Sequence, residues 1–169
     1  MDSFTIDGSG DHGYRLDNSV VYPYDLLTPF DVPSLSLIAG ADFDLSTQDN
    51  SLDIQVSQAN DKLWSLGANN NRIYEYDITL PGGTPTFTYN GNSFNFGGVL
   101  VNPKFFTINK DEDKLFIYDE VTERVYVFDV ITPGDITSAS YTGVNVELKG
   151  LKSLSFNTEG TLVYVHPRS

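Results

Sequence analysis

The sequence contains no cysteine and only two histidines, His12 and His166, which lie at opposite ends of the chain. The absence of cysteine excludes a thiolate nucleophile, a cysteine-ligated zinc site and an iron–sulfur cluster. The sequence also lacks a G-x-S-x-G motif, an H-E-x-x-H motif and a phosphate-binding loop, each of which would indicate a specific reaction. We therefore expect a protein that is not an enzyme and has no catalytic residues, no metal site and no cofactor.

Basic residues are also scarce, since 10 Lys and Arg stand against 23 Asp and Glu and give a net charge of −13. Binding to DNA or RNA depends on basic side chains that displace counterions from phosphates. We therefore expect no nucleic-acid partner. Acidic turns instead keep a β-rich protein with open strand edges soluble.

Long apolar runs are missing as well. No segment approaches the roughly 20 apolar residues that a membrane-spanning helix needs. The first residues, Met1 to Gly8, lack both the basic and the apolar region of a signal peptide. We expect no membrane insertion and no export by the general secretory route. These absences fit a protein that is made in the cytoplasm and built into a larger particle better than they fit a secreted enzyme.

What the sequence does contain is a repeated β pattern, seen best in residues 104–130. Residues 105–108, 114–118 and 125–130 are short runs rich in aromatic and β-branched side chains, which favour strands. Two charged, turn-forming segments separate these runs. This part of the chain is therefore predicted to be a three-stranded meander.

The pattern recurs with a constant period. Segments with the same aromatic pair begin at residues 21, 73 and 125, which are 52 residues apart (73 − 21 = 52 and 125 − 73 = 52). We predict a single repeat domain, 1–169, with units at about 3–39, 52–90 and 104–142 and a half unit at about 152–166. Four short strands in about 50 residues are typical of a β-propeller blade. The predicted fold is all-β, with about three and a half antiparallel four-stranded propeller-like blades per chain and essentially no helix.

Residues 113–118 and 125–141 resemble the propeller-type repeats of surface and structural proteins from bacteria and from bacteriophages, especially marine ones. The resemblance implies a non-enzymatic structural or accessory protein of a virus particle, such as a capsid decoration or a tail component. Such a protein would act as a protein-interaction or attachment module. The implied localisation is the virion, with a bacterial cell surface or an extracellular location as the alternative.

The number of blades has a consequence for partners. Closed propellers typically hold four to eight blades, and an uncovered terminal strand pair exposes an edge that aggregates. We therefore expect the chain to assemble with itself, most simply as a homodimer that completes one ring, or to dock on other particle proteins.

A second hypothesis is a glycan-binding propeller module. Its candidate ligand contacts are Trp64, Tyr89, Phe94 and Phe96, since flat aromatic rings interleaved with asparagine amides can bind carbohydrate. The same pattern fits a strand with one buried face. Trp64 also matches Phe116 of the next unit, which favours core packing.

Three further segments match a functional pattern only in part. Residues 8–13 read G-x-G-x-x-G, but a strand pattern follows where a dinucleotide site needs a helix. Residues 7–11 alternate Asp, Ser and Asp as at the start of a calcium loop, but Asn18 stands where a bidentate Glu is needed. The carboxylates of residues 111–113 would suit a hydrolase, our third hypothesis, but they fall in a predicted hairpin turn and the other units do not keep them.

Overall fold

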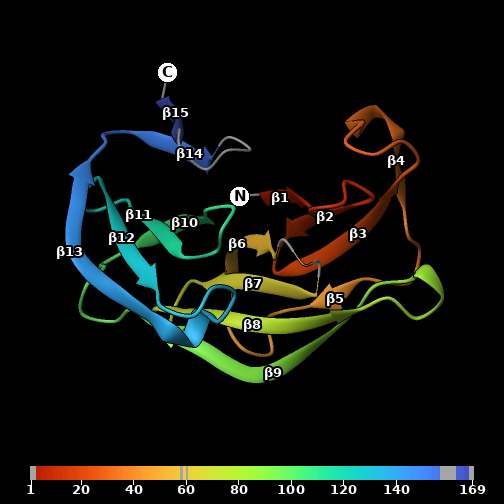
Figure 1. The fold of residues 1–169 in the computed structure, drawn as a ribbon, viewed down its shortest axis with the longest axis horizontal. Helices are drawn as coiled ribbons and strands as arrows, with labels where there is room; N and C mark the ends of the chain where they lie inside the picture. The colour runs from red at the N-terminus through yellow and green to blue at the C-terminus, as the bar shows by residue number, and fades with distance from the viewer. Residues whose placement is uncertain (1–2, 58, 60, 157–162, 168–169) are drawn as a thin grey trace.

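In the computed structural model, which describes residues 3–57, 59, 61–156 and 163–167, the chain forms antiparallel sheets that follow one another along an arc (Figure 1). The first sheet contains β1 (Ser3–Ile6), β2 (His12–Asp17), β3 (Val20–Leu26) and β4 (Leu35–Leu37), with β5 (Phe43–Asp44) also paired to β3. The second contains β6 (Ser51–Val56), β7 (Lys62–Gly67), β8 (Arg72–Thr79) and β9 (Thr86–Asn95). The third contains β10 (Pro103–Ile108), β11 (Lys114–Asp119), β12 (Arg124–Val130) and β13 (Ala139–Glu147). The last pairs β14 (Leu151–Phe156) with β15 (Val163–Pro167).

Each of the three larger sheets is built on a meander, β1–β4, β6–β9 or β10–β13, in which each strand pairs with its neighbour in sequence, and β5 joins the first sheet through β3. We call them blade 1 (β1–β4), blade 2 (β6–β9) and blade 3 (β10–β13). The helical segments of the described chain are three short 3₁₀ turns, η1 (Val32–Ser34), η2 (Pro81–Gly83) and η3 (Ile136–Ser138). The predicted all-β fold of propeller-like four-stranded blades is confirmed. In the described part of the chain no helix has the length and apolar character to cross a membrane.

The sequence period is preserved in the pairing of the strands. At the same place in each blade, a basic side chain on the second strand lies opposite an aspartate on the third. The pairs are His12 with Asp25, Lys62 with Asp77 and Lys114 with Asp129. The aspartates are 52 residues apart (77 − 25 = 52 and 129 − 77 = 52), so residues at this spacing occupy equivalent places in the blades.

The turn between the first and second strands is closed by a polar side chain in each blade. The side-chain acceptors and backbone N–H donors are Asp7 with Asp11 (3.1 Å), Ser57 with Lys62 (3.1 Å) and Asn109 with Lys114 (2.9 Å). Short polar side chains favour such turns because they satisfy backbone groups that lack a strand partner.

The first strands of the blades, β1, β6 and β10, lie side by side with β14 on the inner side of the arc (Figure 1). Apolar side chains fill the space between successive sheets. Trp64 and Ile73 of blade 2 share a core with Leu115, Phe128 and Ile136 of blade 3. Burial of each large side chain contributes roughly 1.5–3 kcal/mol, so the contacts between blades are a main source of stability.

Two outer strands run beyond their predicted ends. We expected ends near residues 90 and 142, but β9 continues to Asn95 and β13 continues to Glu147. In each strand three residues face one partner residue, because the pairing shifts between Tyr74 and Tyr76 and again between Tyr126 and Phe128. Glycines with positive φ, Gly91 (92°) and Gly143 (82°), lie within these bulges, so the Asn-Gly pair at residues 90–91 bends a strand and does not end it.

Candidate functional site

A cavity of about 250 Å³ opens where the first strands of the blades meet. Its lining residues come from β1, β6, β10 and β14. They are Ser3, Phe4, Leu52, Asp53, Gln55, Lys104, Phe105, Lys152, Ser153, Leu154 and Ser155. The wall thus combines hydroxyl, amide and charged groups with aromatic rings, which is the mixed lining of a small-molecule site.

Asp53 is the buried acidic group of this cavity. Its Oδ1 accepts hydrogen bonds from the Ser3 hydroxyl and from the backbone amide of Ile54 (2.9 Å), and its Oδ2 accepts one from the backbone amide of Phe106 (2.9 Å). One carboxylate therefore joins the first strands of blades 1, 2 and 3. Burial is the largest influence on this group and raises its pKa to about 6, although the three hydrogen bonds act in the opposite direction.

Two ammonium groups and an aromatic ring complete the cavity. Lys104 Nζ lies 3.2 Å from Glu120 Oε2, whereas Lys152 forms no ion pair with any residue that the structure describes. Phe4 is 41% exposed, so part of its ring is open to contact. In a chain with only 10 Lys and Arg, two lysines at one cavity make it locally attractive to an anion.

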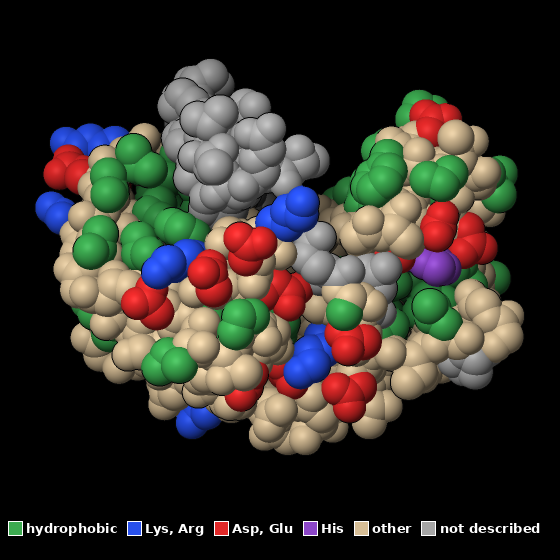
Figure 2. All heavy atoms as spheres, viewed as in Figure 1, with side chains coloured by type: hydrophobic (Ala, Val, Ile, Leu, Met, Phe, Trp, Pro, Cys, Tyr) green, Lys and Arg blue, Asp and Glu red, His purple; other side chains and the backbone are tan. Residues whose placement is uncertain are grey.

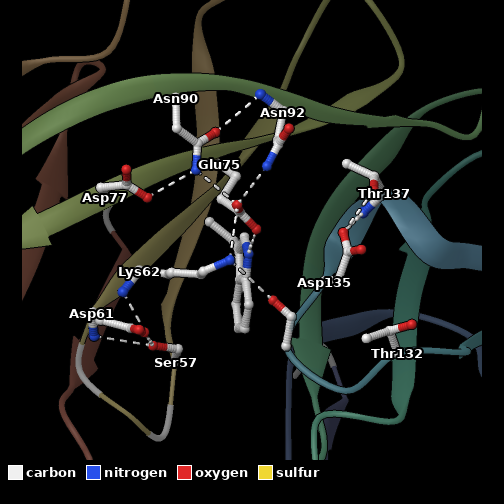
Figure 3. A network of polar contacts seen from close by, with 12 residues as sticks. Ser57, Asp61, Lys62, Glu75, Asp77, Asn90, Asn92, Thr132, Asp135 and Thr137 are labelled. Atoms are coloured by element: carbon white, nitrogen blue, oxygen red, sulfur yellow. Dashed lines mark hydrogen bonds and ion pairs between the residues drawn. The ribbon is translucent and has the colours of Figure 1, made fainter.

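A second polar cluster lies in blade 2, beside the loop that leads into η3 (Figure 3). The side chain of Glu75 is fully buried and accepts hydrogen bonds from four side-chain nitrogens. The donors are Lys62 Nζ (3.0 Å), Trp64 Nε1 (3.0 Å), Asn90 Nδ2 (2.8 Å) and Asn92 Nδ2 (3.0 Å). Lys62 Nζ also donates to the carbonyl oxygen of Gly134 (3.4 Å), which links blade 2 to blade 3.

Glu75 has a structural role. Burial by itself would raise the pKa of Glu75, but the hydrogen bonds from Asn92, Trp64, Asn90 and Lys62 outweigh burial and hold the pKa below its ordinary value. A carboxylate that is ionised and fully paired in this way stabilises a single arrangement of its neighbours.

The four aromatic residues predicted to contact a glycan lie in the core or at its border. Trp64 (0% exposed) and Phe96 (1%) are buried, and Phe94 packs against the same cluster between blades 2 and 3. Tyr89 packs against the cluster between blades 1 and 2. The structure therefore does not bring the four rings together on one surface, and the candidate site lies elsewhere, at the inner cavity.

The other sequence patterns form turns. His12 Nδ1 lies 2.9 Å from Asp7 Oδ2, and the Ser9 hydroxyl donates to Asp7 Oδ1 (2.9 Å), so the loop with alternating polar residues is closed on itself. Asp113 accepts a hydrogen bond from the Asn109 amide (2.7 Å) across the tip of the β10–β11 hairpin. Among the described residues there is no group of three or more His, Cys, Asp or Glu that could hold a metal ion. The side chain of His166 lies outside the described residues.

The residues of the cavity were not singled out from the sequence. One signal was present, since Lys104 and Lys152 occupy matching places in the repeat, 48 residues apart (152 − 104 = 48). Asp53 gave a second signal, because it is a carboxylate inside a predicted strand. Neither signal shows that the first strands of different blades converge.

No family model matches this sequence, and no curated protein matches it. Solved structures do share its fold. A functionally unknown protein from Desulfotomaculum acetoxidans has a TM-score of 0.68 and 13% identity over 100% of this chain and 49% of that protein. A putative 6-phosphogluconolactonase from Bacteroides fragilis has a TM-score of 0.61 and 13% identity over 86% of this chain and 38% of that protein. Hydrazine synthase of Kuenenia stuttgartiensis has a TM-score of 0.59 and 11% identity over 96% of this chain and 40% of that protein.

The chain has a propeller-type fold. At these low identities the likeness shows the fold and carries no activity with it. The chain spans about half or less of the length of each of these proteins.

Proposed function

We propose that this chain is a non-enzymatic binding module that holds one acidic sugar unit of a glycan in the inner cavity. The observation that carries this proposal is the convergence of Asp53, Lys104, Lys152 and Phe4 on one cavity from four different first strands. Asp53, Lys152 and Phe4 each suit a different part of such a ligand.

The polar groups divide between the hydroxyls and the acid of the ligand. Asp53 Oδ2 accepts a single hydrogen bond from the described residues, and a carboxylate oxygen can accept a further bond from a sugar hydroxyl. The ammonium group of Lys152 suits a carboxylate through a charge-assisted hydrogen bond. The exposed part of the Phe4 ring offers an apolar surface to one face of a sugar ring.

The size of the cavity limits the ligand to about one sugar unit. Sites for drug-sized molecules have volumes of roughly 300–1,000 Å³, and this cavity has about 250 Å³. A single terminal residue of a glycan fits this limit better than an extended oligosaccharide.

Binding without turnover is the form of the proposal that the residues favour. Asp53 is already held by three donors from three blades, so it is fixed in place as a recognition group. One fold neighbour is named as a putative 6-phosphogluconolactonase, and this name supports a sugar-derived ligand. At 13% identity the likeness does not support the same reaction.

The setting that we propose is an attachment module of a virus particle. This part of the proposal is supported by the resemblance of residues 113–118 and 125–141 to repeats of bacterial and bacteriophage surface proteins. Recognition of an acidic sugar would give such a module a ligand on a cell surface.

Isothermal titration calorimetry with the methyl glycoside of glucuronic acid, and with methyl glucoside for comparison, tests the proposal. We expect the glucuronide to bind more tightly than the neutral glycoside, and Lys152→Ala to weaken its binding at least tenfold, about 1.4 kcal/mol. Lys149→Ala is the matched control, because Lys149 is exposed, pairs with Glu147 and does not line the cavity.

The absence of binding by both glycosides, or equal effects of the two lysine variants, would contradict the proposal. A separate assay follows hydrolysis of gluconolactone with and without the protein. We expect the spontaneous rate in both cases, and an acceleration that is lost in Asp53→Asn would identify an enzyme instead.

A further inference from the structure

Two loops at the same place in the repeat have the same internal structure. In blade 1 the Ser34 hydroxyl lies within hydrogen-bonding distance of the carbonyl oxygens of Thr28 (3.2 Å) and Asp31 (2.6 Å). In blade 3 the Ser138 hydroxyl lies at similar distances from those of Thr132 (3.4 Å) and Asp135 (2.8 Å). The first loop carries η1 and the second carries η3, 104 residues later (136 − 32 = 104).

The equivalent apolar residues of these loops differ in burial. Ile136 of η3 is 0% exposed and belongs to the core between blades 2 and 3, where η3 packs against β9. Val32 of η1 is 49% exposed, and the neighbouring Phe30 is 63% exposed. Hydrophobic side chains accordingly gather on the lobe that carries η1 and β4, at the upper right of Figure 2. In blade 1, therefore, the loop side chains equivalent to those that join blade 3 to blade 2 are exposed to solvent.

The rest of this face has the composition of a protein interface. The strand pairing places Gly13 and Arg15 where blade 3 has the core residues Leu115 and Ile117. The Arg15 guanidinium lies 5.2 Å from the centroid of the Tyr22 ring. Arginine and aromatic residues are enriched at protein–protein interfaces. The side chains on this face of blade 1 are therefore those of a surface that binds another protein, not those of an internal core.

The complementary surface is present on β13 of the same chain. In blade 2, Phe94 pairs with Ile73 and packs against the core cluster that includes Ile136. Val146 pairs with Val125 at the equivalent place in blade 3 (146 − 94 = 52). Ile136 covers Phe94 in blade 2, but no described residue covers Val146 in the same way. Val146 is therefore 51% exposed.

We propose that a second copy of this chain docks its η1 loop on β13, so that Val32 of one copy packs against Val146 of the other. The η1 loop would take beside Val146 the place that η3 takes beside Phe94, while β14 keeps its place beside β10 and covers the inner part of this side of blade 3. Since both halves of the contact lie on one chain, two copies can make it twice and close a two-fold dimer. Two copies together also have about the length of the fold neighbour of which this chain spans 49%.

Light scattering on the purified chain, over a wide range of protein concentration, measures the association. We expect a mass of about twice 18.7 kDa. Val32→Asp and Val146→Asp should each raise the dissociation constant at least tenfold, because each puts a charge into both contacts of the dimer. Both side chains are half exposed, so circular dichroism and thermal melting should show folded variants. Val121→Asp is the matched control, since Val121 is 62% exposed and lies in the β11–β12 turn, outside both the η1 loop and β13.

Mixing the two variants gives the sharper test. The Val146→Asp copy keeps an intact η1 loop and the Val32→Asp copy keeps an intact β13. We expect the mixture to form a heterodimer through this one contact, with weaker affinity than the wild type. A wild type that stays monomeric at every concentration would overturn the proposal. So would a dimer unaffected by either substitution, or a mixture that fails to associate.

Discussion

The Asp53 carboxylate in β6 accepts a hydrogen bond of 2.9 Å from the backbone amide of Phe106 in β10. This bond joins the first strands of two blades at the wall of the inner cavity. A buried carboxylate in such a place affects stability as well as recognition, because its ionised form has lost contact with water.

Asp53 should make the stability of the protein fall as the pH rises from about 4 to about 6. Its pKa in the folded protein is raised from 3.8 to about 6, so the folded state holds this proton more tightly than the unfolded chain. The contribution is complete below pH 3.8 and is lost as the pH passes the folded value. At about 1.4 kcal/mol per pKa unit, the shift corresponds to about 3 kcal/mol.

Urea denaturation at several pH values checks this prediction. The difference in unfolding free energy between the wild type and Asp53→Asn should change by about 2 kcal/mol between pH 4 and pH 7. Asp111→Asn, which removes a carboxylate at the exposed tip of a hairpin, is the matched control. Parallel curves for the wild type and Asp53→Asn would show that Asp53 does not titrate in this way.

Removal of the Glu75 carboxylate should destabilise the protein strongly. Glu75→Ala leaves the Lys62 ammonium, the Trp64 indole and the amides of Asn90 and Asn92 without their shared acceptor. Breaking a buried ion pair by removing one partner costs about 3–5 kcal/mol. Glu147→Ala, at a half-exposed carboxylate, should cost less than about 0.5 kcal/mol. Urea denaturation of both variants measures the difference, and equal losses of unfolding free energy would contradict the structural role of Glu75.

The pH dependence due to Glu75 has the opposite sign to that of Asp53. Its pKa is held below 4.5, so its contribution is present above that pH and is lost as the pH falls through the folded value. Glu75→Gln should therefore flatten the acid side of the stability curve, which acid titration followed by tryptophan fluorescence would show.

Truncation of the two equivalent loop residues should have unequal effects. Ile136→Ala removes a side chain that is 0% exposed and should cost about 2–5 kcal/mol. Val32→Ala should cost less than about 0.5 kcal/mol, since Val32 is half exposed. Thermal melting at a concentration where the chain is monomeric provides the comparison. A large loss from Val32→Ala under those conditions would mean that its own chain covers it.

A charge in the core between blades 2 and 3 should prevent folding. Leu115 is 0% exposed, and Leu115→Asp would bury an unpaired carboxylate at a cost of several kcal/mol. Far-ultraviolet circular dichroism should show loss of the β signal, whereas Val121→Asp should melt like the wild type. A soluble Leu115→Asp variant with unchanged melting would contradict the assigned strand register.

The fold could be predicted because the repeat places the same kinds of residue at the same turns and strands. Asp25, Asp77 and Asp129 show that the sequence period is also a structural period. The predicted ends of β9 and β13 were wrong, because in the sequence a glycine in a bulge cannot be told from a glycine in a turn when the partner strand is unknown.

The cavity could not be predicted, because its residues come from strands about 50 positions apart. The pattern within a strand tells which residues alternate, but not which strands of different blades meet. The case of Trp64 is similar, since its burial depends on blade 3 and its hydrogen bond depends on Glu75 in the next strand.

The meander topology of the blades has a consequence for the order of folding. Every strand pair within a blade joins neighbours in sequence, so blades 1 and 2 can form while the rest of the chain is still being synthesised. Asp53 cannot complete its hydrogen bonds until Phe106 has emerged, and its carboxylate stays hydrated and readily charged until then. The docking of blade 3 dehydrates it, and late protection of the Phe106 amide in pulsed hydrogen exchange would mark that step.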